Sequence, residues 1–201
     1  MSEKAIEESP LPTKKILYEY QEKGMDKIFD TLDKAPDNYN LLYQLPTGGG
    51  KTVIFSEIAS RYLASTDKKI LILTHRVELC KQTSEMLAGF DVKNKIISSN
   101  VKELPDQDNY RCFVAMVETL NNRLKDDVMD IQDIGMVIVD EAHFNSFRKL
   151  FHYFEDCIML GVTATPLSSN VKLPMYQNYN ELIVGESIQF LINKGFLSSP
   201  T

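Results

Sequence analysis

Short apolar runs alternate with amphipathic stretches along the 201-residue chain, and this alternation constrains the fold more than any other feature. The clearest run, "IGMVIVD" at 134–140, is apolar on both faces, as in a strand buried inside a sheet. Similar runs, "NLLYQL", "KILILT", "RCFVAMV" and "IMLGVTATP", are separated by helical patterns such as "YQEKGMDKIFDTLDK" and "VELCKQTSEMLAGF". Strands alternating with helices predict a single α/β domain with a mainly parallel sheet and helices on both faces.

The boundaries of this domain follow from composition. Residues 1–13 are polar, carry two prolines and lack periodicity, so we expect a flexible tail there and an ordered domain over 14–201. No apolar run approaches the ~18 residues needed to span a bilayer, which predicts no membrane segment. Three widely spaced cysteines form no metal-binding or redox pair, and we expect a reducing, cytoplasmic setting.

A glycine-rich loop, "PTGGGKT", joins the first apolar run to a helical pattern. Its glycines allow backbone N–H groups to converge on phosphate oxygens, and the following helix adds partial positive charge. The residues predicted to surround the phosphates of ATP are Thr47, Gly48, Gly49 and Gly50. Lys51 is expected to bridge the β- and γ-phosphates, and the Thr52 hydroxyl to bind Mg²⁺. The strict phosphate-loop pattern has glycine where this chain has Leu45, so a chance glycine-rich turn remains the alternative.

Two acids, Asp140 and Glu141, end the run at 134–140. A carboxylate at the end of a buried strand is costly unless it meets a cation or a donor. We expect Asp140 to hold Mg²⁺ and Glu141 to orient and deprotonate the attacking water. The alternative is a strand that ends in two solvated acids. The phosphate loop and the acid pair are complementary halves of one ATP·Mg site.

With "DEAH" at 140–143 the sequence resembles superfamily 2 helicases, and further motifs agree in order and spacing. The resemblance implies a RecA-like P-loop domain that forms the ATP-binding half of a motor. "YEYQ" at 18–21 resembles the adenine-reading element with Gln21 as its glutamine, although Tyr18 stands where relatives often have arginine. "TATP" at 163–166 resembles the element that links the ATP site to nucleic acid. The coupling residues implied are His143, Thr163 and Thr165.

Two other motifs resemble elements that contact nucleic acid: "THRVELCKQ" at 74–82 and "VETLNNR" at 117–123. The contacts implied are Arg76, Gln82, Thr119 and Arg123. The formal net charge of −6 gives no support to nucleic-acid binding, but it does not exclude a local basic track.

Within the superfamily the motifs look most like the group of DNA translocases that includes type I and type III restriction subunits and XPB-like helicases. This resemblance favours DNA over RNA as the partner. It also implies a second RecA-like domain, which this chain lacks, so that the chain alone would hydrolyse ATP very slowly. Three alternatives stay open: an RNA helicase, a nucleotide-dependent binding module that does not translocate, and a P-loop ATPase without a nucleic-acid role.

Overall fold

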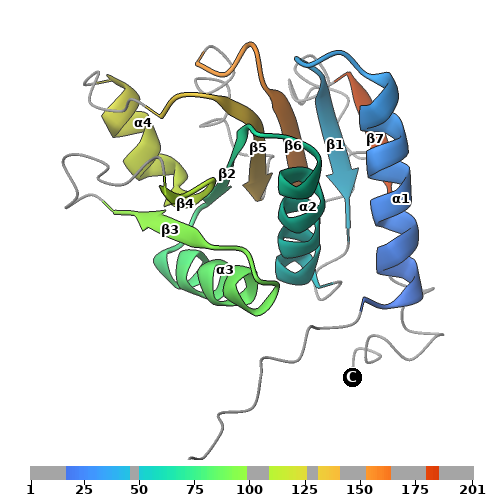
Figure 1. Cartoon of the computed structure of the whole chain (residues 1–201), viewed down its shortest axis with the longest axis horizontal. Coiled ribbons are helices and arrows are strands. Elements are labelled where there is room, and N and C mark those ends of the chain that lie inside the picture. The colour runs from blue at the N-terminus through green and yellow to red at the C-terminus, as the bar shows by residue number, and fades with distance from the viewer. Residues whose placement is uncertain are drawn as a thin grey trace, which may run out of the picture.

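The computed structural model describes residues 17–45, 50–98, 109–125, 131–140, 153–163 and 180–185. Within these ranges the chain forms four helices and seven strands, shown in Figure 1. In chain order they are α1 (Glu19–Lys34), β1 (Asn40–Gln44), α2 (Lys51–Ser65), β2 (Lys69–Thr74), α3 (Val77–Gly89), β3 (Asn94–Ile97), β4 (Cys112–Met116), α4 (Val117–Lys125), β5 (Ile134–Asp140), β6 (Ile158–Thr163) and β7 (Glu181–Val184). The tail predicted over 1–13 lies outside the described residues. None of the described helices is long and apolar enough to cross a membrane.

All seven strands form one sheet in the order β3-β4-β2-β5-β6-β1-β7, and every pairing is parallel. This confirms the predicted parallel sheet. Parallel strands end at the same edge of the sheet, so the residues that follow β1, β2, β4, β5 and β6 share that edge (Figure 1). Apart from "YEYQ" at 18–21, which precedes β1, each predicted motif begins at or after the end of one of these strands, so the topology brings their described residues to one side of the molecule.

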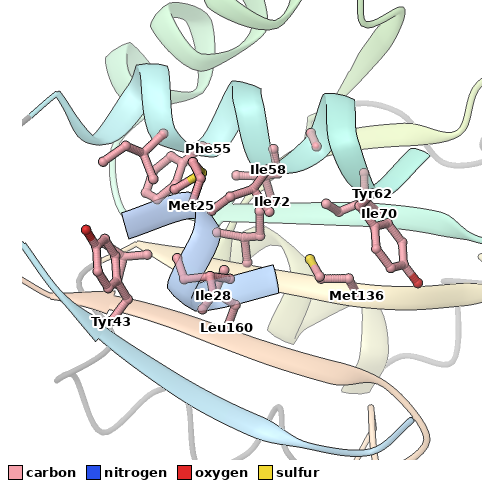
Figure 2. Packing of buried hydrophobic residues seen from close by; sticks show 14 of the residues in the cluster. Met25, Ile28, Tyr43, Phe55, Ile58, Tyr62, Ile70, Ile72, Met136 and Leu160 are labelled. Carbon is pink, nitrogen blue, oxygen red and sulfur yellow. The ribbon is translucent and has the colours of Figure 1, made fainter. Parts of the chain in front are cut away.

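Helices cover both faces of the sheet, as the alternating pattern predicts. On the first face, Met25 and Ile28 of α1 and Ile58 of α2 pack over the strand residues Ile72 and Leu160 (Figure 2). The same cluster includes apolar residues of α3. On the second face, α4 contributes buried side chains to a separate cluster with alternate strand residues. Burial on both faces explains why the central strands are apolar at successive positions.

Strand β7 was not predicted. It has four residues, "ELIV", and pairs with β1 at the edge of the sheet, where Leu41 aligns with Glu181. Its start is fastened by side chains, because Asn40 donates its backbone N–H to Asn180 Oδ1 at 2.9 Å. The hydroxyl of Tyr39 donates to Glu181 Oε2 at 2.8 Å. Four residues carry too little periodicity to identify a strand whose partner lies far away in the sequence.

Gly24 lies inside helix α1, where close packing against β1 leaves no room for a larger side chain. A Cβ on Gly24 of α1 would meet the hydroxyl oxygen of Tyr43, a residue of β1 that is 1% exposed. We therefore expect Gly24→Ala to lower the free energy of unfolding by about 1 kcal/mol, because overpacking outweighs the gain in helix propensity. Urea unfolding would measure this. In a Tyr43→Phe background the loss should shrink, and a Gly24→Ala variant that gains stability would contradict the assigned contact.

Candidate nucleotide-binding site

The candidate site lies at the carboxyl ends of β1, β5 and β6, which are neighbours in the sheet. Asp140, the last residue of β5, aligns with Val162, and Gln44, the last residue of β1, aligns with Thr163. The loop after β1 leads into α2. The ends of these three strands therefore bring the predicted phosphate loop and the first predicted acid to the same place, where open parallel sheets bind ligands.

Helix α2 begins at Lys51, directly after Gly50. Gly50 has φ +78° and ψ 43°, the left-handed region in which side chains other than glycine are strained. Its carbonyl accepts a hydrogen bond from Ile54 N at 3.1 Å and so starts the helix. The first N–H groups of such a helix have no partner within it and favour an anion. Gly50, Lys51 and Thr52 are thus placed as a phosphate cradle requires.

The structure pairs the two predicted halves of the site. Lys51 Nζ lies 3.3 Å from Asp140 Oδ1, across 89 residues of sequence. The side chain of Asp140 is 6% exposed and that of Lys51 is 18% exposed, so the pair is largely shielded from water. A shielded ion pair interacts more strongly than an exposed one. The buried carboxylate at the end of β5 is therefore stabilised by the lysine of the phosphate loop.

This donor set fits a magnesium ion bound with a nucleotide. Mg²⁺ prefers oxygen ligands, and it is held in nucleotide sites by one or two protein oxygens together with phosphate oxygens. Asp140 supplies a carboxylate, and Thr52 supplies a hydroxyl in the first turn of α2. In the described part of the chain, no group of three or more His, Cys, Asp or Glu side chains could hold a metal ion by itself. A metal here would depend on the nucleotide for further ligands.

Gln21 connects helix α1 to the phosphate loop. Its side chain is buried, and its Oε1 accepts a hydrogen bond from Tyr18 N at 2.9 Å. Its Nε2 stands next to Gly50, where a Cβ on that glycine would be. The start of α1 and the start of α2 are therefore in contact through one glutamine side chain.

The end of β6 holds the start of the phosphate loop. Leu45 donates its N–H to the carbonyl of Thr163 at 2.9 Å, and both residues are fully buried. Leu45 belongs to the apolar cluster on the first face of the sheet. Leu45, which stands where the strict phosphate-loop pattern has glycine, is thus part of the hydrophobic core. Thr163, predicted as a coupling residue, adjoins the loop through its backbone.

The predicted nucleic-acid residues separate into two groups. Arg76 is exposed at the start of α3, Gln82 is exposed in the middle of that helix, and Thr119 is half-buried in α4. Arg123 is only 7% exposed, and its Nη2 donates to the carbonyl of Ser98 at 2.6 Å. Its Nη1 has no hydrogen-bond partner within the described ranges. Arg76 and Gln82 can contact a partner directly, whereas Arg123 holds the segment that follows β3.

One residue that positions Arg76 was missed from the sequence. The hydroxyl of Thr74, the last residue of β2, donates to the carbonyl of Arg76 at 3.2 Å and lies 3.0 Å from Cys80 Sγ. Thr74 is fully buried, so these contacts fix the turn between β2 and α3. A threonine at the end of a strand, two residues before the arginine, is the signal that could have identified it.

The other predicted site residues lie outside the described residues. They are Thr47, Gly48, Gly49, Glu141, His143 and Thr165.

The three cysteines are buried free thiols. Burial raises the pKa of Cys112 to about 12 and that of Cys157 to about 11, and it also raises the pKa of Cys80. Because a raised thiol pKa leaves less thiolate, we expect native protein at pH 8 to react with a disulfide reagent about 100-fold more slowly than unfolded protein. Absorbance of the released thiolate measures the rate, and a fast native phase would contradict this burial.

A parallel sheet whose carboxyl edge carries a phosphate-loop helix start and a shielded Lys–Asp pair is the arrangement of a P-loop nucleotide-binding domain. The fold is that of helicase motor domains. It superimposes on the UvsW helicase of bacteriophage T4 with a TM-score of 0.64 at 20% identity, covering 83% of this chain and 59% of that one.

The family is also shown by sequence. The chain belongs to the family described as "Type III restriction enzyme, res subunit", whose model matches residues 14–168. This confirms the resemblance to restriction motor subunits.

Two longer proteins are similar to this chain. A Saccharomyces cerevisiae protein named as an ATP-dependent helicase, IRC3, is 31% identical over 149 residues, which cover 70% of this chain and 21% of IRC3. The ATP-dependent DNA helicase mph1 of Sclerotinia sclerotiorum is 30% identical over 148 residues, which cover 65% of this chain and 12% of mph1. The chain therefore spans a small part of the length of these relatives.

Proposed function

We propose that this chain is the ATP-binding motor domain of an ATP-dependent DNA helicase or translocase. The observation that carries the proposal is the Lys51–Asp140 pair, 3.3 Å apart and largely shielded at the carboxyl edge of the sheet. A nucleoside triphosphate with its metal requires a lysine at the start of a helix to bind the phosphates and a carboxylate at the end of a buried strand to bind the metal. The family match and the names of the two relatives support the same activity.

Each residue has a distinct part in this proposal. The backbone N–H groups at Gly50 and the start of α2 bind phosphate, and the Lys51 ammonium compensates charge on the β- and γ-phosphates. Thr52 and Asp140 hold Mg²⁺, which when bound neutralises charge on the phosphate oxygens. Glu141, next along the chain, orients and deprotonates the attacking water. The reaction is hydrolysis of the γ-phosphate by in-line attack.

The proposed motor role requires two partners besides ATP, which are DNA and a second RecA-like domain. Arg76 at the start of α3 and Gln82 in the middle of that helix, both exposed, contact the DNA backbone. His143, Thr163 and Thr165 couple that contact to the state of the nucleotide. A second RecA-like domain completes the site and supplies arginines to the transition state, a contribution worth about 10³–10⁵ in turnover in related phosphoryl-transfer enzymes. Buried, unpaired thiols are compatible with a reducing compartment such as the cytoplasm.

The two arginines give a paired test of the DNA contact. Arg76→Ala should weaken binding to duplex DNA of any sequence and lower the slope of log affinity against log salt by about 1, because one phosphate contact is lost. The free energy of unfolding should change by less than about 0.5 kcal/mol, since Arg76 is exposed. Fluorescence anisotropy with labelled duplex, measured at several salt concentrations, gives both the affinity and the slope.

Arg123→Ala should behave differently. It removes a charged, buried hydrogen bond to Ser98, so we expect a loss of about 1.5–3 kcal/mol in the free energy of unfolding. Urea unfolding separates this effect from DNA binding. If both variants bind DNA as tightly as the wild type, a P-loop ATPase without a nucleic-acid role becomes the better account.

A further inference from the structure

The last residues of β1 before the phosphate loop are held from two sides. On one side, Leu45 donates its N–H to the carbonyl of Thr163 in β6. On the other side, the carbonyl of Gln44 accepts the N–H of Gly185, which directly follows β7, at 2.8 Å. Strand β6 lies inside the sheet, whereas β7 lies at its edge beside β1 (Figure 1). The chain therefore enters the phosphate loop between one interior strand and one edge strand.

The contact between Gly185 and Gln44 leaves no room for a side chain. A Cβ on Gly185 would lie 2.7 Å from the carbonyl oxygen of Gln44 and 3.0 Å from the hydroxyl oxygen of Tyr43. The carbonyl belongs to the backbone of a paired strand, so it cannot swing aside as the end of a flexible side chain can. Glycine is the residue that permits so close an approach of two backbones. The hydrogen bond to Gln44 thus depends on glycine at position 185.

Strand β7 has few attachments beyond this bond. It has four residues, and β1 is its one neighbour in the described sheet. Ile183 packs into the cluster on the first face, and the hydroxyl of Tyr39 donates to Glu181 at the start of the strand. Elements with few contacts open locally at a lower free energy than the centre of a sheet. The end of β7 is therefore the place where the sheet can open next to the phosphate loop.

We propose, building on the function proposed above, that β7 is a clamp on the phosphate loop and that Gly185 is its positioning residue. With β7 seated, the carbonyl of Gln44 is fixed and the loop is held ready for phosphate. With the end of β7 displaced, the entry of the loop is held from the β6 side alone, and nucleotide must then order it at a cost in affinity. The coupling is reciprocal, so bound nucleotide in turn seats β7. The seating of β7 thus sets nucleotide affinity from outside the nucleotide site.

Gly185→Ala tests the clamp. In titrations of the full chain with Mg·ATP, this variant should bind about tenfold more weakly than the wild type, a typical strength of coupling between two sites. Gly135→Ala is the matched control, because a Cβ on Gly135 would also overlap its neighbours, Tyr62 and Lys68, but at the opposite edge of the sheet. It should unfold at lower urea concentration and bind Mg·ATP like the wild type. A folded Gly185→Ala variant with wild-type affinity would overturn the proposal.

A double variant separates the clamp from core packing. If Gly185→Ala acted by crowding the hydroxyl of Tyr43, the added substitution Tyr43→Phe would restore the affinity. The clamp predicts that the affinity stays low, since the carbonyl of Gln44 is the closer atom and remains in place. Recovery of wild-type affinity in the double variant would contradict the role assigned to Gln44.

Hydrogen exchange in the unaltered chain tests the coupling without any substitution. The N–H of Gly185 should exchange about tenfold more slowly at saturating Mg·ATP, because nucleotide seats the end of β7. The N–H of Asn180, which donates to the carbonyl of Asn40 at the start of β7, should change by less than about twofold. Unchanged exchange at Gly185, or equal slowing at both amides, would count against the clamp.

Lys51→Ala distinguishes failure of the clamp from failure of the proposed function. If Lys51→Ala weakens Mg·ATP binding while Gly185→Ala does not, the nucleotide site stands and only the clamp falls. If Lys51→Ala binds Mg·ATP as tightly as the wild type, or the wild type does not bind it, both fall together.

Discussion

Replacing Lys51 with alanine should reduce ATP turnover by about 10²–10³-fold, the usual cost of removing one group that stabilises charge in a transition state. The reason lies in its position: the ammonium stands at the start of α2 and 3.3 Å from Asp140, where phosphate charge and metal would meet. Phosphate release, measured with the protein that carries this domain, gives the turnover. Lys51→Arg keeps the charge but changes the geometry, so it should retain structure without restoring full activity.

The same substitution has a structural cost that must be separated from the loss of activity. Lys51→Ala removes the cationic neighbour of the Asp140 carboxylate, whose side chain is 6% exposed. We expect the free energy of unfolding to fall by about 1–3 kcal/mol. Circular dichroism before and after the assay would establish that the variant is folded. A folded Lys51→Ala variant that turns over ATP at the wild-type rate would exclude the assigned site.

Asp140→Asn is the substitution with the second large expected effect on ATP turnover. The amide has nearly the size of the carboxylate but lacks its charge, so the proposed Mg²⁺ site would lose its charged ligand while the packing at the end of β5 is kept. Turnover at saturating ATP should fall by about 100-fold or more, and the Mg²⁺ concentration needed for half-maximal rate should rise. Titrating Mg²⁺ at fixed ATP measures both quantities.

Asp133→Asn provides the matched control. Asp133 is exposed, precedes β5 at the opposite edge of the sheet, and has φ +61°, a conformation that asparagine adopts readily. It should leave both the rate and the Mg²⁺ requirement unchanged. Equal losses in the two variants would mean that Asp140 acts through general electrostatics and is not a metal ligand.

Much of the fold follows from the sequence because the central strands are buried on both faces. The run at 134–140 coincides with β5, and "KILILT" at 69–74 coincides with β2. Strand order could not be predicted in this way, because apolar periodicity says which residues are buried but not which strand pairs with which. Strand β7 has no distinctive pattern, and its identity rests on pairing with β1.

The candidate site shows the same division. The Lys51–Asp140 pair could be expected because residues after parallel strands gather at one edge of the sheet. The burial of Arg123 could not, because its partner is the backbone carbonyl of Ser98, and a carbonyl leaves no mark on the sequence. The capping contact of Gln21 was not foreseen either, because its partner is the backbone N–H of Tyr18, and a backbone N–H likewise leaves no mark on the sequence.

The most direct test of the motor proposal is the ATP turnover of the protein that carries this domain, with and without duplex DNA, using Lys51→Ala as the blank. The account predicts strong stimulation by DNA in a protein that also contains the proposed second domain, and very slow turnover by residues 1–201 alone, because that domain would supply the arginines of the transition state. Turnover that is stimulated by RNA and not by DNA would contradict it, and so would rapid DNA-stimulated turnover by the 201-residue chain alone.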